Sequence, residues 1–104
     1  MKRNYKLKFE KEARADLTNS IKWYNEQKEG LGKYFFNEVN IFLDFIKSHP
    51  DACEQKHRNA RFLPLKRFPF VIIYTVDDSL KIINIVAVFN TYRNPDKYKN
   101  RIND

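Results

Sequence analysis

The sequence predicts an α+β domain with the element order β-α-α-β-β-β, in which a helical hairpin packs on one face of an antiparallel meander sheet. Three observations carry this prediction. Apolar residues alternate near the N-terminus, recur at helical spacing over residues 12–48, and form dense β-branched and aromatic runs after residue 60. The chain has 104 residues, so we expect one domain over residues 1–104.

The first half of the chain predicts one strand and two helices. In YKLKF, residues 5–9, apolar side chains alternate with lysines, as they do in a half-buried strand. From residue 12 the apolar period becomes that of an amphipathic helix. Gly30 and Gly32 are the only glycines, and they indicate a tight reversal between two helices. Pro50 disfavours a helical conformation at His49, so the second helix is expected to end near residue 48.

The second half predicts the sheet. DACEQKHRNA, residues 51–60, has no usable period and predicts a loop. Strands are expected at residues 60–65, 70–76 and 80–89, separated by the turns KRFP and DDS, and Pro64 indicates an edge or a bulge. Short turns favour an antiparallel meander, which the first strand joins after the helical crossover. The helices then cover one face of the sheet, and the other face is less completely covered.

Basic residues are concentrated in the second half of the chain. Lys and Arg number 20 against 13 Asp and Glu, which gives a net charge of +7. This charge favours an anionic partner, such as nucleic acid, an acidic protein segment or a membrane surface, but it also fits a small protein that is merely kept in solution. No acid occurs between Gln55 and Val76, and the C-terminal segment adds four more cations. In a meander both basic segments can lie on one side of the sheet.

This clustering favours a surface that contacts phosphates or carboxylates over a solvated sheet rim. The candidate binding residues are Arg61, Lys66, Arg67, Tyr74, Arg93, Lys97, Tyr98 and Arg101. For Tyr98 the favoured role is packing against the core edge, whereas for Arg93 a functional role is favoured. Asn94 is suited to cap a helical turn and Pro95 to begin it, so a short turn or helix is expected over residues 95–101.

Other chemistry is sparse in the sequence. Cys53 is the only cysteine, which excludes an internal disulfide and fits a reducing compartment. The two histidines lack metal-ligand spacing and no glycine-rich phosphate loop occurs, so we predict neither a metal nor a cofactor. The N-terminus has no apolar signal-peptide segment, and no apolar run is long enough to span a membrane. We therefore expect a cytoplasmic protein without a membrane partner.

Four segments resemble the RelE/ParE superfamily, the toxin half of bacterial type II toxin–antitoxin pairs. They are ARADLTNSIKWYNEQKEGLGKYFFNEV, RFLPLKRFPFVIIYTVDD, KIINIVAVF and YRNPDKY, in family order and over nearly the whole chain. The WY-x-x-Q-x-x-GLG and RFPF-x-I-x-Y patterns are the more specific ones. The end is similar to the family's Arg-x-Pro followed by an aromatic residue, here Tyr98. The resemblance implies a cognate antitoxin, often with an acidic C-terminal segment, and allows a toxin–antitoxin hetero-oligomer.

The resemblance implies two candidate activities. RelE-like members cut messenger RNA in the ribosomal A site without a metal, whereas ParE-like members inhibit DNA gyrase and have no nuclease chemistry. The positions at which the nucleases carry catalytic cations read Phe62, Pro64 and Val71 here, and Asn90 stands where many relatives have His. The sequence therefore favours the gyrase-inhibiting branch.

A ribosome-dependent endonuclease remains the alternative. In that case Tyr92 and Arg93 are the catalytic candidates, together with Tyr98, and Lys66 and Arg67 in the adjacent turn are the substitute cations. A toxin that has lost its activity is a third interpretation.

Overall fold

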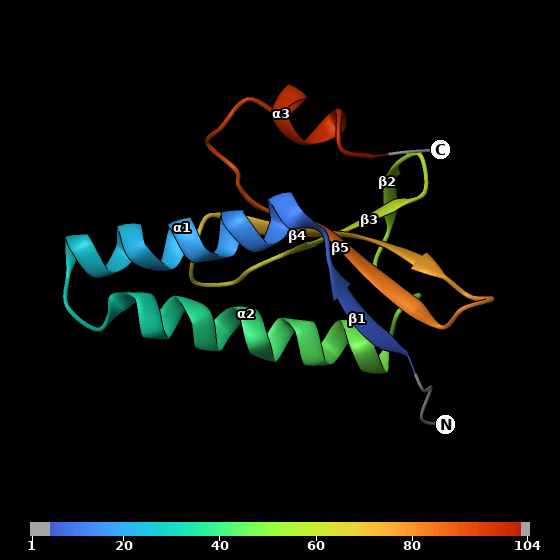
Figure 1. The fold of residues 1–104 in the computed structure, drawn as a ribbon, viewed down its shortest axis with the longest axis horizontal. Coiled ribbons are helices and arrows are strands. Elements are labelled where there is room, and N and C mark those ends of the chain that lie inside the picture. The colour runs from blue at the N-terminus through green and yellow to red at the C-terminus, as the bar shows by residue number, and fades with distance from the viewer. Residues whose placement is uncertain (1–4, 103–104) are drawn as a thin grey trace.

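The computed structural model describes residues 5–102 and contains a five-stranded sheet with a helical hairpin on one face (Figure 1). The predicted α+β fold is confirmed. The elements in chain order are β1 (Lys6–Phe9), α1 (Lys11–Gln27), α2 (Leu31–Ser48), β2 (Gln55–His57), β3 (Ala60–Pro64), β4 (Phe70–Asp77), β5 (Ile82–Asn90) and α3 (Asp96–Lys99).

The sheet is mixed, with the strand order β1-β5-β4-β3-β2. Strands β2 to β5 form an antiparallel meander, which confirms that part of the prediction. Strand β1 pairs in parallel with β5, with Leu7 opposite Ile83 and Phe9 opposite Ile85. The first strand thus joins the meander in parallel, because the helical crossover and the meander return β5 beside β1 in the same direction.

The prediction of a loop over residues 51–60 is wrong for Gln55–His57, which forms the edge strand β2. Arg58 adopts a left-handed conformation with φ of 54°, and this turn folds β2 back onto β3. The strand carries only polar and charged side chains, so no apolar alternation marks it in the sequence. Polar edge strands of this kind protect a sheet from pairing with other chains.

The two glycines produce the predicted reversal between α1 and α2. Gly30 has φ of 86°, a left-handed conformation that side chains disfavour. Gly32 packs against α1, where an added Cβ would lie 2.5 Å from the backbone oxygen of Ile21. Its N–H donates to the side-chain oxygen of Asn25 at 2.9 Å. The glycines therefore set both the turn and the close approach of the helices.

Both faces of the central strands are buried. On one face, fully buried residues of α2, such as Phe35, Val39 and Ile46, pack with residues of the sheet and of α1. Each such side chain contributes about 1.5–3 kcal/mol by burial. On the opposite face, Ile102 and Tyr98 from the C-terminal segment cover a second apolar cluster, and α3 lies across the strands from α2 (Figure 1).

None of the helices within residues 5–102 combines the length and the apolar character needed to cross a lipid bilayer.

Candidate functional site

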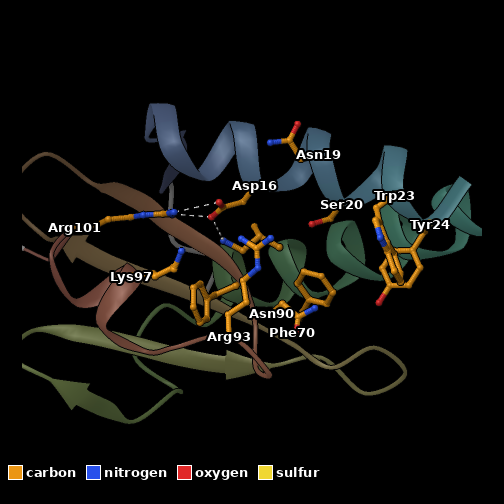
Figure 2. A pocket seen from close by; sticks show the side chains of 12 residues that line it. Asp16, Asn19, Ser20, Trp23, Tyr24, Phe70, Asn90, Arg93, Lys97 and Arg101 are labelled. Atoms are coloured by element: carbon orange, nitrogen blue, oxygen red, sulfur yellow. Dashed lines mark hydrogen bonds and ion pairs between the residues drawn. The ribbon is translucent and has the colours of Figure 1, made fainter. Parts of the chain in front are cut away.

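A cleft of about 430 Å³ lies between α1, the C-terminal end of β5 and the C-terminal segment (Figure 2). Polar groups of α1, including Asn19 and Ser20, line one wall, and the cations Arg93 and Lys97 line the other. Asn90, at the end of β5, lies between them. The cleft thus joins a helix to a segment more than 70 residues further along the chain.

The cleft opens where β5 loses its neighbouring strand. Strand β1 pairs with β5 only as far as Ile85, so the next residues of β5 present unpaired backbone groups to this side. The carboxylate of Asp16 accepts a hydrogen bond from the N–H of Val88 at 3.1 Å. The guanidinium of Arg101 donates to the carbonyl oxygen of Val86 at 3.3 Å. Side chains from α1 and the C-terminal segment therefore provide hydrogen-bond partners for some of the backbone groups on the open edge of β5.

The same two side chains form a bidentate ion pair, which Figure 2 shows at one end of the cleft. Nitrogen atoms of Arg101 lie 2.7 and 3.2 Å from the carboxylate oxygens of Asp16. The side chains are only 19% and 18% exposed, so the pair is poorly screened by water. It fixes the C-terminal segment to α1 and holds the cleft in its observed shape.

The cleft carries excess positive charge. Among the described residues that line it, Asp16 is the one carboxylate, and Arg101 neutralises it. Arg93 and Lys97 are exposed and make no ion pair with any residue between 5 and 102. Trp23, 55% exposed, adds a flat apolar surface at the far end. This combination suits a ligand that has both carboxylate or phosphate groups and apolar groups.

Two comparisons with known proteins bear on this fold. A family model described as "ParE toxin of type II toxin-antitoxin system, parDE" matches residues 7–95. The chain belongs to the ParE toxin family. The match runs from β1 to the start of the C-terminal segment and so includes most of the cleft, but it ends before Lys97 and Arg101.

A solved structure described as "Chromosomal ParDE TA system from P. aeruginosa" has a similar fold. It is 19% identical, covers 83% of this chain and 95% of its own, and gives a TM-score of 0.72. The comparison with curated protein sequences gives no match. The ParE-family membership confirms the resemblance seen in the sequence and, at this low identity, the structural match supports the fold alone.

The structure brings only some of the predicted binding residues of this ParE-family chain to the cleft. Arg93, Lys97 and Arg101 line the cleft, whereas the other five candidates do not. Arg61 donates to the carbonyl oxygens of Cys53 and of Asp51, and its guanidinium lies 3.8 Å from the Asp51 carboxylate. It therefore secures the loop before β2.

Lys66 and Arg67 lie in the β3–β4 turn, which α2 holds in place. The carboxylate of Glu38 accepts the backbone N–H groups of both residues, at 2.9 and 2.7 Å. Their side chains are exposed but do not line the cleft. This turn therefore lies apart from the cleft cations, because the carboxylate of Glu38 holds its backbone against α2.

The two candidate tyrosines have structural positions. Tyr74 is fully buried, its hydroxyl donates to the carbonyl oxygen of Pro50, and burial raises its pKa well above the usual range of a phenol. Tyr98 packs edge-on against Phe62 and Phe89, with ring centroids 5.5 and 4.7 Å away. Burial also raises the pKa of Tyr98. This is the packing role that the sequence favoured for Tyr98.

The catalytic candidates of the nuclease interpretation lie just after β5. Tyr92 is largely exposed and its backbone N–H donates to the side-chain oxygen of Asn90 at 2.9 Å. The side-chain oxygen of Asn94 accepts the N–H of Asp96 at 3.0 Å, and the short helix α3 follows. The segment after Arg93 thus forms the predicted helical turn. In the part of the chain that the structure describes, no group of three acidic, His or Cys side chains is placed to hold a metal ion.

The sequence did not single out the α1 wall of the cleft. Asp16, Ser20 and Trp23 follow one another at spacings of four and three residues, so they share one side of α1. This side borders the apolar stripe that faces the core, and Tyr24 of that stripe also lines the cleft. A polar stripe that includes a tryptophan was the available signal, but nothing in the sequence shows that the C-terminal segment lies against it.

Proposed function

We propose that the chain inhibits DNA gyrase by binding it through the cleft, and that an acidic segment of a cognate antitoxin neutralises it. Membership of the ParE toxin family supports this proposal, because the resemblance associates ParE-like toxins with gyrase and RelE-like toxins with messenger RNA. Net charge of +7 supports an anionic or acidic partner.

The observation that carries the choice of target is the chemistry of the sheet face opposite α2. The resemblance places Phe62, Pro64 and Val71 at the positions at which RelE-like nucleases have catalytic residues, and Pro64 is paired with Val71 across β3 and β4. Phe62 packs on Tyr98, which also contacts Phe89. An apolar cluster cannot accept a 2′-hydroxyl proton or stabilise a phosphate in the transition state.

The free cations of the cleft support its role in binding. Arg93 and Lys97 come from a segment that is fixed at one end by the Arg101 ion pair and by buried Ile102. A rigid support lowers the entropy cost of binding through these side chains. Trp23 is exposed beside them and belongs to a residue type that often contributes strongly to protein interfaces.

The test is a supercoiling assay with purified, antitoxin-free protein. The protein is titrated into gyrase from the same source with relaxed plasmid and ATP. We expect inhibition, or accumulation of cleaved DNA, at near-stoichiometric protein. Undisturbed supercoiling by well-folded protein would contradict the proposal. Discrete cuts in translated messages, lost in Tyr92→Phe or Arg93→Ala, would instead establish the nuclease alternative.

Two lysines of α3 provide a matched comparison. Lys97 lines the cleft, whereas Lys99 is exposed on the same helix and does not line it. We expect Lys97→Ala and Arg93→Ala each to raise the inhibitory concentration about tenfold, equivalent to about 1.4 kcal/mol. Lys99→Ala removes the same charge and should change inhibition less than threefold. Equal effects of the two lysine substitutions would show that net charge, and not the cleft, determines binding.

A further inference from the structure

The cleft runs along α1 as a short groove. Asp16 and Trp23 lie towards its opposite ends, and seven residues at a rise of 1.5 Å place them about 10 Å apart along the helix axis (Figure 2). The volume of about 430 Å³ lies in the usual range of clefts that hold small ligands, about 300–1,000 Å³. A short length of one extended chain therefore fits the groove.

The edge of β5 inside the groove is closed to a peptide strand. An extended peptide adds to a sheet through the free backbone N–H and C=O groups of the edge strand. Here the N–H of Val88 already donates to the carboxylate of Asp16 at 3.1 Å. The carbonyl oxygen of Val86 accepts from the guanidinium of Arg101 at 3.3 Å. Because these two side chains also hold each other in a bidentate ion pair, a peptide backbone would have to displace both.

The groove keeps two cations for a ligand. The charge of Arg101 is neutralised by Asp16. Arg93 and Lys97, in contrast, form no ion pair with any residue between 5 and 102. A nucleic-acid strand carries one negative charge per nucleotide on its backbone, so two free cations match two successive phosphates. Such a strand needs no free sheet edge.

Trp23 provides a surface on which a base can stack. It is 55% exposed, and its indole lies nearly perpendicular to the ring of Tyr24, with the centroids 5.1 Å apart. Stacking on an aromatic side chain tolerates any base, but it requires a base that is not already stacked within a duplex. The groove is also lined by neutral side chains that can hydrogen-bond the edge of a base or the sugar, namely Asn19, Ser20 and Asn90.

We propose that the cleft binds a single-stranded segment of DNA about two nucleotides long. Its phosphates contact Arg93 and Lys97, and one of its bases stacks on Trp23. Cations beside an aromatic platform are the usual means of holding a single strand without regard to its sequence. This inference rests on the proposed function and names the partner of the same site: in the complex of gyrase with DNA, the cleft contacts a DNA strand.

The first test uses the intrinsic fluorescence of Trp23, which is the only tryptophan of the chain. Two probes of about eight nucleotides are titrated into the purified full chain. One is single-stranded DNA, and the other has the same phosphates but is abasic at every position. We expect the DNA to quench the fluorescence and to bind about fivefold more tightly or better, because a stacked base adds to the phosphate contacts. Equal quenching and equal affinity would overturn the inference.

Matched variants assign the two kinds of contact, with binding measured by the anisotropy of labelled probes. Trp23→Leu should abolish the preference for DNA over the abasic probe, whereas Trp23→Phe keeps an aromatic ring and should retain most of it. A lost phosphate contact reduces the slope of log affinity against log salt by about 0.7 for a single strand. We expect this change in Lys97→Ala and less than about 0.2 in Lys99→Ala, because Lys99 does not line the cleft. Equal slopes in the two lysine variants would contradict the proposal.

Two further probes test the class of partner. Tighter binding of RNA than of DNA with the same sequence would overturn the inference, because the site would then recognise the 2′-hydroxyl. The second probe is gyrase without DNA. If it captures the chain as strongly as the gyrase–DNA complex does, and Trp23→Leu weakens both captures equally, the cleft contacts the enzyme and the inference is wrong.

The supercoiling assay separates this inference from the proposed function. We expect Trp23→Leu to raise the inhibitory concentration about fivefold and Trp23→Phe less than about twofold. If the chain inhibits gyrase but shows no preference for DNA over the abasic probe, the inference is wrong while the proposed function stands. If the chain binds the DNA as expected and leaves supercoiling undisturbed, the proposed function fails, whereas the assignment of the cleft to single-stranded DNA stands.

Discussion

The ion pair between Asp16 and Arg101 is expected to determine how firmly the C-terminal segment is attached. We propose to measure it with a double-mutant cycle of Asp16→Asn and Arg101→Met. Asparagine keeps an oxygen that can accept the N–H of Val88, and methionine keeps much of the length of the arginine chain. The cycle therefore isolates the charged interaction from packing and from the strand edge.

The expected size follows from geometry and burial. Two hydrogen bonds between charged groups, at 2.7 and 3.2 Å, join the side chains, and each is about one-fifth exposed. Hydrogen bonds to charged groups contribute about 1.5–3 kcal/mol each, and desolvation offsets part of this for the pair. We expect a coupling free energy of about 2 kcal/mol.

Urea unfolding of the four proteins gives the coupling energy directly. The pair of Arg61 and Asp51 serves as the control, because its atoms lie 3.8 Å apart and the carboxylate side chain is 47% exposed. A cycle there should give less than about 1 kcal/mol. A coupling below about 0.5 kcal/mol for Asp16 and Arg101 would refute the reasoning, since the pair would then behave as an ordinary surface ion pair.

Three further predictions concern the stability of the fold. Glu38→Ala leaves the N–H groups of Lys66 and Arg67 without their acceptor and should lower the free energy of unfolding by about 3 kcal/mol in urea, with a smaller loss for Glu38→Gln. Gly32→Ala places a Cβ 2.5 Å from a backbone oxygen of α1 and should cost about 2 kcal/mol in thermal unfolding. Burial raises the pKa of Tyr98, so its phenol stays protonated in the folded state at a pH at which it is ionised in the unfolded state. The free energy of unfolding should therefore fall as the pH rises above about 10. Tyr98→Phe should make that fall shallower.

Each of these predictions has a contrary outcome. An unchanged free energy of unfolding in Glu38→Ala would mean that water satisfies the β3–β4 turn equally well. A stable Gly32→Ala variant would mean that the helices separate without cost. An identical alkaline slope in Tyr98→Phe would mean that the Tyr98 phenol ionises alike in the folded and unfolded states.

Much of the fold was predictable because apolar periodicity is a local property of the chain. Each local pattern predicts the element that contains it. This holds for the alternation at residues 5–9, the apolar stripes of α1 and α2, and the dense apolar runs of β4 and β5. Gly30 and Pro50 mark where α2 begins and ends for reasons of backbone conformation alone. Strand β2 was missed because three polar residues at an edge carry no such pattern.

The candidate site was only partly predictable, because it depends on contacts between distant residues. The sequence identified Arg93, Lys97 and Arg101 from charge and position. Their partner Asp16 lies 85 residues before Arg101 and was not singled out. Only the packed chain brings these groups to one cleft.

By itself, the sequence determined the secondary structure except for the edge strand β2, the excess of positive charge, and the family to which the chain belongs. These follow from local patterns and from composition, which require no knowledge of how the elements pack. The tertiary structure alone decided which cations lie together. Glu38 draws the β3–β4 turn to α2, and Asp16 draws the C-terminal segment to α1, so one basic sequence is divided into two separate surfaces. The physical reason is that each of these carboxylates is largely removed from water and requires hydrogen-bond donors, and the nearest donors in space are far away in the chain.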